Sequence, residues 1–280
     1  ASAELVEVLD IALDVSERSG GALDVTVGPL VEAWGFGPAS RIDDPLGPTP
    51  TEADLERLRR HVGFEKIEVD PTAGTIAKTD RETTVDVSAI AKGYAAESVA
   101  SLLRDLGYDR VLVEVGGELA ASGARRSGEP WTVGIESPDV GVPGIWGTVA
   151  LADEGIATSG DYRDYYERDG VRYAHIIDPR TGRPITSRGA AVAVVHQSAA
   201  MADAWATALS VLGPRIGLPE IDAAVPGERD LAIGFHGVRI QEEECVCRKK
   251  AECAPHDKRF GTERTGWIDT GYFQDRAVLN

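Results

Sequence analysis

The chain has 280 residues, a formal net charge of −17 at pH 7 and a sequence pI of about 4.7. This acidity argues against a nucleic-acid surface, because phosphate backbones are bound by clustered lysine and arginine. The length suffices for one large domain or two small ones, and no apolar run is long enough to span a bilayer. An anionic ligand is repelled by such a chain, so a phosphate site here requires a local cation or metal.

The predicted elements mix helices with many short strands. Helices are predicted where apolar residues recur at helical spacing, over residues 3–18, 51–61, 88–105 and 199–212, with a further turn or helix starting at Pro29. Strands are predicted near 22–27, 66–69, 75–78, 83–87, 110–115, 119–124, 131–136, 147–151, 162–167, 171–177 and 190–196. Thr51 with Asp54 resembles a capping box, and Asp169-Gly170 indicates a hairpin. The pattern predicts an α+β fold with mostly antiparallel sheets and packed helices.

The C-terminal part reads differently from the rest. Hydrophobic periodicity fades after Leu212, and all three cysteines, Cys245, Cys247 and Cys253, lie near the end of the chain. Their spacing matches no zinc pattern and favours stray thiols. We therefore predict a main domain over residues 1–213 and a divergent tail over 214–280.

The stretch from Thr84 to Glu97 turns from strand-like alternation into a helix within a few residues. Asp86 and Ser88 are typical N-cap residues, so the helix is expected to start directly after them. A helix start presents unpaired N–H groups and suits phosphate, and Lys92 adds a full charge one turn in. Most such junctions bind no anion, so this stretch alone leaves both readings open.

Asp203 and Thr207 are four residues apart and share one face of the last predicted helix. A carboxylate and a hydroxyl are hard oxygen ligands suited to Mg²⁺ or Ca²⁺. The plainer alternative is a polar stripe on an amphipathic helix. Because the helix is otherwise rich in alanine and expected to be buried, its polar groups need partners, and a metal would serve.

Two further segments carry candidate site residues. His175 stands at a strand end close to Asp178, where it is either a base or a ligand contact, whereas Asp178 reads as an ordinary turn residue. Thr158, Ser159 and Gly160 place two hydroxyls and a glycine at a predicted strand end, which suits a phosphate loop but also an ordinary turn. Aromatic residues at Trp34 and Phe36 either stack on a planar ligand or belong to the core.

Seven segments, in this order, resemble the ApbE family, the FAD:protein FMN transferases. The resemblance covers roughly residues 3–213, and the ordered set is far more specific than any single motif. The segments are GALDVTVGPLVEAWGFG (21–37), VDVSAIAKGYAAE (85–97), VGGE (115–118), VGIESP (133–138), ATSG (157–160), HIIDPRTG (175–182) and ADAWATALSVLG (202–213).

The resemblance implies an α+β, T-fold-like architecture and a definite reaction. The family transfers the FMN moiety of FAD to a threonine or serine hydroxyl of an acceptor flavoprotein, releases AMP and requires Mg²⁺. FAD is thus expected as the substrate and a flavoprotein as the partner. Two alternatives share the same motifs: a Mg²⁺-dependent FAD pyrophosphatase, in which water replaces the hydroxyl, and a flavin-binding protein without catalysis.

The resemblance also implies roles for individual residues. Metal ligands are expected from the Ala89 carbonyl and the side chains of Asp203 and Thr207, and His175 is expected beside the pyrophosphate. Because the acceptor hydroxyl needs a general base, we assign that role to His175. The expected FAD contacts are Ala22, Leu23, Asp24, Asp86, Lys92, Thr158, Ser159, Gly160 and His175.

Two departures from the family pattern, and the location of the family members, carry expectations of their own. Ala206 stands where some members have a second aspartate. Members normally begin with a further segment that touches the flavin, so we expect this chain to be N-terminally shortened. Members are commonly exported and lipid-anchored, and we expect an extracytoplasmic location and membrane association only through such an anchor.

Overall fold

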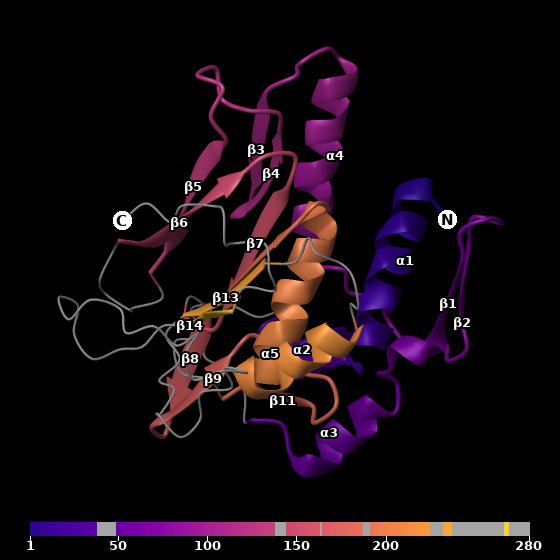
Figure 1. Ribbon diagram of the computed structural model, residues 1–280. Helices are drawn as coiled ribbons and strands as arrows, with labels where there is room; N and C mark the ends of the chain where they lie inside the picture. The colour runs from indigo at the N-terminus through magenta and orange to yellow at the C-terminus, as the bar shows by residue number, and fades with distance from the viewer. Residues whose placement is uncertain are drawn as a thin grey trace.

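A computed structural model of the chain describes residues 1–37, 49–137, 144–162, 164–186, 191–224, 232–236 and 266–268, with side chains as far as residue 213. A six-stranded sheet with the order β14-β13-β12-β7-β4-β3 occupies its centre, and every neighbouring pair is antiparallel (Figure 1). The α+β prediction is confirmed. The strands are β3 (Val111–Val115), β4 (Glu118–Ser122), β7 (Gly155–Gly160), β12 (Ala191–His196), β13 (Ala232–His236) and β14 (Gly266–Ile268).

Four antiparallel pairs surround this sheet. The turn between β8 and β9 has positive φ at Asp169 (53°) and Gly170 (75°), which confirms the predicted hairpin. The pairs are β1 (Ile67–Asp70) with β2 (Thr75–Lys78), β5 (Trp131–Glu136) with β6 (Ile145–Leu151), β8 (Tyr165–Arg168) with β9 (Val171–Ala174), and β10 (Ile177–Asp178) with β11 (Arg183–Pro184).

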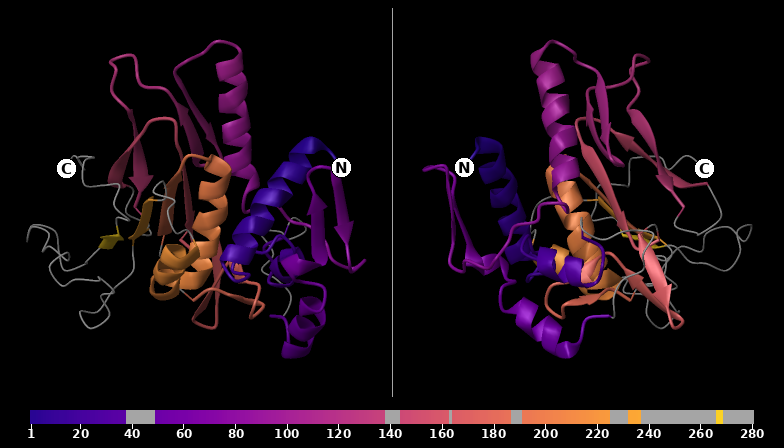
Figure 2. Two further views of the ribbon diagram at one scale, coloured as in Figure 1. Left: turned by 45° about the vertical axis from the view of Figure 1, so that its right-hand side comes forward. Right: turned by 180° about the vertical axis from the view of Figure 1, so that it is seen from behind.

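The helices gather on one face of the central sheet, and α1 lies beside α5 in both views of Figure 2. They are α1 (Ala3–Arg18), α2 (Gly28–Ala33), α3 (Glu52–Arg59), α4 (Ala91–Asp105) and α5 (Ala199–Ala224), with a 3₁₀ turn η1 (Phe64–Lys66). The capping box predicted for Thr51 and Asp54 is present at the start of α3. Among the described helices, none combines the length and apolar character that crossing a membrane requires.

Strand β12 separates two apolar layers. Val192 and Val194 pack into the cluster formed with α1 and α5, which includes the buried Trp205. Their neighbours Ala193 and Val195 point the other way and pack against β5 and β6. Alternate residues thus face opposite layers, as strand geometry requires, and α5 is held against a strand buried on both sides.

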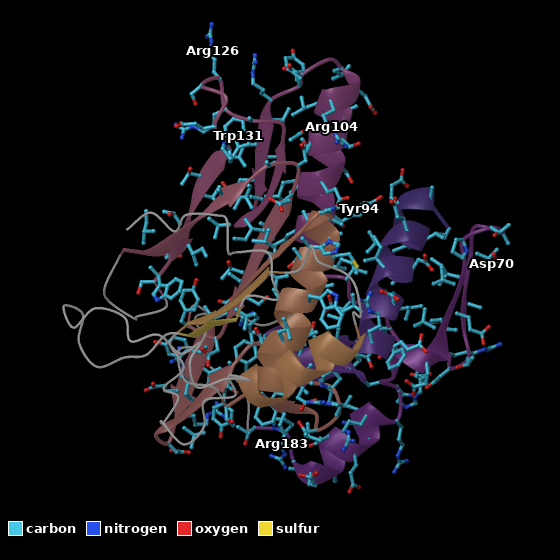
Figure 3. The ribbon with its side chains drawn as sticks, viewed as in Figure 1. Asp70, Tyr94, Arg104, Arg126, Trp131 and Arg183 are labelled. Carbon is cyan, nitrogen blue, oxygen red and sulfur yellow. The ribbon has the colours of Figure 1, made fainter. Side chains whose placement is uncertain are left out.

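Tyr94 and Arg183, labelled in Figure 3, each make a polar contact with a distant segment of the chain. The Tyr94 hydroxyl donates to Glu7 at 2.7 Å and joins α4 to α1. Arg183 forms an ion pair with Glu52 and joins β11 to α3. Both pairs stand at the surface, so they contribute orientation more than stability.

Two predicted strands are absent from the described structure. Residues 22–27 form turns, because the Asp24 carboxylate accepts the Thr26 N–H and bends the chain locally. Residues 83–87 form no strand in the described structure, although the Asp86 N–H donates to the Val25 carbonyl at 2.7 Å. Strand-forming composition at both places is overridden by side-chain and long-range hydrogen bonds.

Two helix boundaries also differ from the prediction. Helix α4 begins at Ala91 with Ile90 as its N-cap, so Asp86 and Ser88 form the preceding turn instead of capping the helix. Helix α5 continues to Ala224 through a kink at Gly213, where φ is 69°. The chain thus continues as helix over residues 214–224 beyond the predicted boundary, and strands β13 and β14 follow. The three cysteines lie outside the described residues, and the division at 213 stays a prediction.

Candidate functional site

The beginnings of α4 and α5 meet at a junction built from small residues. A Cβ at Gly93 would collide with the Ala199 carbonyl oxygen and lie 2.8 Å from the Asp203 Cβ. On the other side, a Cβ at Gly155 in β7 would overlap Ala199. Glycine is therefore required at both positions for the first turn of α5 to fit between α4 and the sheet.

Asp203 is buried at this junction, with 2% of the residue exposed. Its Oδ2 accepts the Gly93 N–H at 2.9 Å, and its Oδ1 lies 3.7 Å from the Lys92 Nζ. Burial raises the pKa of the Asp203 carboxyl to about 7, and the nearby ammonium opposes this shift only in part. The ionised carboxylate thus has one good hydrogen bond and a single ammonium at 3.7 Å, an incomplete compensation that a bound cation would improve.

The Ala89 carbonyl lies one helical turn before Gly93. In a regular helix it would accept the Gly93 N–H, but that N–H donates to Asp203 instead. The Ala89 carbonyl accepts no hydrogen bond from the part of the chain that the structure describes. Its lone pairs are therefore available to a ligand.

Thr207 lies one turn further along α5 on the face that carries Asp203. Its Oγ1 is 3.2 Å from the Ser159 Oγ in β7. Residues 155–160 form a central strand paired with β12, so the prediction of a loop at Thr158, Ser159 and Gly160 is wrong. The Thr158 N–H nevertheless donates to Glu118, and Ser159 contacts Thr207, while the role of both residues toward FAD stays a prediction.

Glu118 is a second buried acid at the junction, and it was missing from the predicted site. It forms an ion pair with Lys92 through Oε1, and its Oε2 accepts the Thr158 N–H at 3.2 Å. Burial, and secondarily Glu118, raise the pKa of the Tyr162 hydroxyl. A glutamate that opens a largely apolar strand directly after two glycines is the local signal that could have identified it.

Three predicted FAD contacts belong to the interior near α1. The side chains of Ala22 and Leu23 are core residues, so these positions can offer a ligand only their backbone. The Asp24 carboxylate accepts the Thr26 N–H (2.8 Å), the Thr26 hydroxyl (2.6 Å) and the Phe64 N–H (2.9 Å). It fastens two loops together and has little capacity left for a ligand.

Asp86 and His175 have no described contact with the junction residues. Asp86 accepts the Ser88 N–H at 2.9 Å and lies over Gly28. The His175 Nδ1 is 3.2 Å from the Asp164 carbonyl oxygen, and its ring meets the edge of Phe36 at 6.4 Å between centroids. The binding roles of Asp86 and His175 and the catalytic role of His175 therefore rest on the resemblance alone.

The aromatic residues pack against each other. Phe36 stacks on Tyr166 at 5.3 Å, Tyr166 on Tyr173 at 5.1 Å, and Tyr173 on Trp34 at 5.4 Å. Trp34 also donates its indole N–H to the Gly182 carbonyl at 2.7 Å. The core alternative for Trp34 and Phe36 is thus the better account of their contacts.

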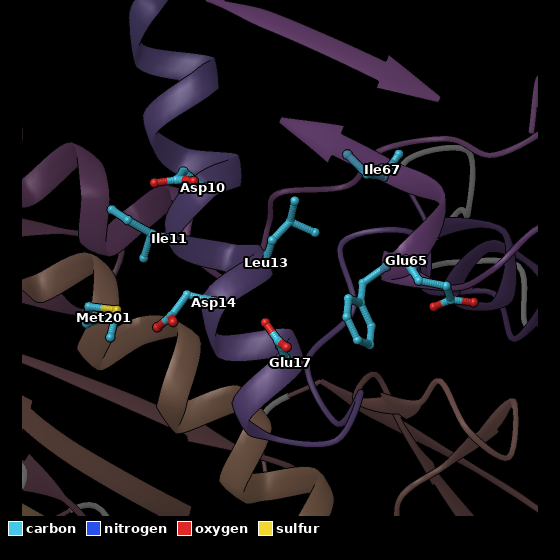
Figure 4. Close-up of a pocket in the computed structure, with 9 residues that line it drawn as sticks. Asp10, Ile11, Leu13, Asp14, Glu17, Glu65, Ile67 and Met201 are labelled. Carbon is cyan, nitrogen blue, oxygen red and sulfur yellow. The ribbon is translucent and has the colours of Figure 1, made fainter. Parts of the chain in front are cut away.

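A cleft of about 710 Å³ lies between α1 and β1 (Figure 4). Four carboxylates and no basic side chain occur among its lining residues, so it is a poor place for a pyrophosphate. It is lined by Asp10, Ile11, Leu13, Asp14, Glu17, Phe64, Glu65, Ile67 and Met201.

The donors at the junction suit a hard cation. No group of three or more His, Cys, Asp or Glu side chains positioned for a metal occurs among the described residues. A metal here would rely on the Asp203 carboxylate, the Thr207 hydroxyl and the Ala89 carbonyl, which are all oxygen donors of the kind that Mg²⁺ prefers. The unbonded carbonyl and the weakly paired buried carboxylate fit that use.

Comparison with known proteins places this geometry in a family. A profile described as the ApbE family matches residues 1–226. The chain is 42% identical over 222 residues to a FAD:protein FMN transferase of Vibrio cholerae, covering 79% of this chain and 65% of that protein. It is 38% identical over 215 residues to the Escherichia coli K12 protein of that name, covering 76% and 60%. The chain thus spans somewhat less than two thirds of the length of these relatives.

Solved structures agree with the sequence comparison. The flavin transferase ApbE from Vibrio cholerae superposes with a TM-score of 0.71 at 39% identity, covering 84% of this chain and 71% of that one. The ApbE protein from Thermotoga maritima gives a TM-score of 0.72 at 28% identity, covering 84% and 73%. The family profile, the sequence identities and the matching folds together show that this chain belongs to the ApbE family.

Proposed function

We propose that the chain transfers the FMN moiety of FAD to a threonine or serine hydroxyl of an acceptor flavoprotein, with Mg²⁺ as cofactor and AMP as the second product. The relatives named for this reaction support the proposal. The observation that carries it is the junction itself, where a buried Asp203 carboxylate meets the start of α4 at 2.9 Å. The net charge of −17 repels anions from the chain as a whole. At the junction, a helix start, the Lys92 ammonium and a bound metal would together attract the phosphates of a dinucleotide.

The reaction is a displacement at phosphorus. The acceptor hydroxyl oxygen forms a bond to the phosphorus of the FMN half, the bond from that phosphorus to the bridging oxygen breaks, and AMP leaves with the bridging oxygen. The hydroxyl proton passes to a base. The protein's task is to hold both partners in line and to stabilise the developing charge.

The residues of this chain divide that task between them. Asp203, Thr207 and the Ala89 carbonyl would hold Mg²⁺, which when bound neutralises phosphate charge and polarises the phosphorus. Lys92, with a half-exposed side chain, supplies a further positive charge at the mouth of the junction. His175 is the proposed base, since donation from Nδ1 to the Asp164 carbonyl leaves Nε2 as the basic nitrogen.

The test is incubation of the chain with FAD, Mg²⁺ and an acceptor protein that carries a candidate threonine. We expect a flavin-fluorescent acceptor band that survives denaturing gel electrophoresis, and its loss with Asp203→Ala while circular dichroism shows the fold retained. Asp10→Ala is the matched control, because it removes a carboxylate from the acidic cleft and should leave the band intact. Unchanged transfer by Asp203→Ala would rule out the metal assignment.

The same experiment separates the alternatives. Release of FMN and AMP without the fluorescent band identifies a pyrophosphatase. Tight FAD binding without turnover in Mg²⁺ identifies a flavin-binding protein. Neither alternative has a structural observation of its own, because all three share the junction.

A further inference from the structure

One ammonium at the junction stands between two buried carboxylates. Lys92 contacts Glu118 directly, whereas its Nζ is 3.7 Å from the Asp203 Oδ1, beyond ordinary hydrogen-bond range. Both acids are about 2% exposed, and Lys92 is the basic side chain that the structure pairs with each of them. The ammonium is therefore shared unequally, with Glu118 as its main partner.

The position of Glu118 is fixed by backbone structure. It is the first residue of β4, paired with Val115 across the Gly116-Gly117 turn. Its second carboxylate oxygen accepts the Thr158 N–H in the adjacent strand β7. Glu118 thus cannot follow Lys92 if the lysine moves, whereas the lysine has a flexible four-carbon stem.

The aliphatic part of the Lys92 side chain also passes close to the backbone of Gly116. A Cβ at Gly116, where φ is 58°, would lie 3.1 Å from the Lys92 Cδ. The glycine turn therefore makes room for the stem to run toward Glu118. Without the Glu118 charge, the nearest remaining buried anion for this ammonium is Asp203.

We propose that Glu118 is a positioning residue that holds the Lys92 ammonium away from Asp203 and so keeps the Asp203 carboxylate available to a divalent cation. The inference rests on the proposed metal role of Asp203. Two negative charges and one positive charge leave the cluster with a net negative charge, which favours a cation. If Glu118 is neutralised, Lys92 and Asp203 cancel each other, and a metal has to displace the ammonium before it can bind.

The test is calorimetric titration of the metal-free chain with MgCl₂ in the absence of FAD. We expect Glu118→Gln, which keeps an acceptor for the Thr158 N–H, to weaken Mg²⁺ binding about tenfold. Lys92→Gln should bind Mg²⁺ at least as tightly as the unaltered chain, because the competing ammonium is gone. In the Lys92→Gln background, the added Glu118→Gln change should have a much smaller effect than about tenfold.

The matched control is Glu114→Gln, which alters an exposed glutamate on the neighbouring strand and should leave Mg²⁺ binding unchanged. If Glu118→Gln weakened Mg²⁺ binding equally in the unaltered chain and in the Lys92→Gln background, the loss would indicate structural damage and would overturn the inference. Unaltered Mg²⁺ binding by Glu118→Gln would overturn it as well, yet leave the proposed function standing if Asp203→Asn still abolishes binding. Absence of Mg²⁺ binding by the unaltered chain would overturn both.

Discussion

Asp24 and Asp203 are both buried aspartates, 6% and 2% exposed, but their surroundings differ. Three donors lie within 2.9 Å of the Asp24 carboxylate, two from Thr26 and one from Phe64. Asp203 has one backbone donor at 2.9 Å and an ammonium at 3.7 Å. Burial is the main cause that raises the pKa of both carboxyls, so burial alone does not distinguish them.

The difference lies in how completely each acid is satisfied. A buried carboxylate with a full set of donors stabilises the fold and has no capacity left for a ligand. One with an incomplete set keeps an unfavourable charge that a cation can neutralise. We therefore expect Asp24 to act as a structural residue of the α1 region and Asp203 to act as a ligand residue.

Gly93→Ala should have the largest effect, because it disrupts the contact on which the Asp203 site depends. The added methyl group collides with the backbone of Ala199 and approaches the Asp203 Cβ, so α4 and α5 must separate. We expect the free energy of unfolding to fall by about 3 kcal/mol in urea titrations, with loss of Mg²⁺ stabilisation.

Gly147→Ala is the matched control for this substitution. Gly147 lies in β6, and a Cβ there meets no atom within 4 Å. The free energy of unfolding of the Gly147→Ala variant should differ little from that of the unaltered chain. If Gly93→Ala were equally mild, the close approach of α4 and α5 would not be needed to hold Asp203 in place.

Asp203→Asn should separate metal binding from folding. The amide oxygen can still accept the Gly93 N–H, and the uncompensated charge is gone, so the metal-free variant should be at least as stable as the unaltered chain. The stabilisation by Mg²⁺, about 2.7 kcal/mol at a hundredfold excess over Kd, should disappear. Thermal unfolding with and without MgCl₂ measures both quantities. If MgCl₂ still stabilised Asp203→Asn, the Asp203 carboxylate would not be needed for metal binding.

Asp24→Asn should give the opposite result. The Asn amide group places N–H donors against the N–H donors of Thr26 or Phe64, which costs about 2 kcal/mol of stability. The Mg²⁺ stabilisation should remain. If Asp24→Asn abolished it while leaving the metal-free stability intact, Asp24 would be a site residue and the distinction drawn here would be wrong.

Sequence patterns predicted the parts of this molecule that depend on local information. The shared helical face of Asp203 and Thr207 follows from spacing alone, and the capping box at Thr51 and Asp54 follows from residue type. The order of the motifs identified the family, which no single motif could do. For the shared helical face and the capping box, residues within about one helical turn carry the signal.

The errors came from interactions between distant segments. Thr158 and Ser159 are ambiguous locally, and pairing with β12 decides that they lie in a strand. Glu118 matters because Lys92 reaches it from another element. The turn near Asp24 is an exception, because there a local contact, the Asp24 carboxylate accepting the Thr26 N–H, replaces strand pairing.

The smallest expected effect is a pH dependence confined to the Asp203 region. Its carboxyl has a pKa of about 7 in the folded metal-free chain against an ordinary value of 3.8, so the folded state holds this proton more tightly. The resulting stability is complete below about pH 4 and is lost as pH rises through about 7. Mg²⁺ must displace the proton, so its stabilising effect should grow between about pH 6 and about pH 8, by less than about 1.4 kcal/mol per unit. Thermal unfolding with MgCl₂ across this range should show that the Mg²⁺ stabilisation increases with pH in the unaltered chain and in Asp24→Asn, but not in Asp203→Asn. If the Mg²⁺ stabilisation of Asp203→Asn still increased with pH, the proton would belong to another group.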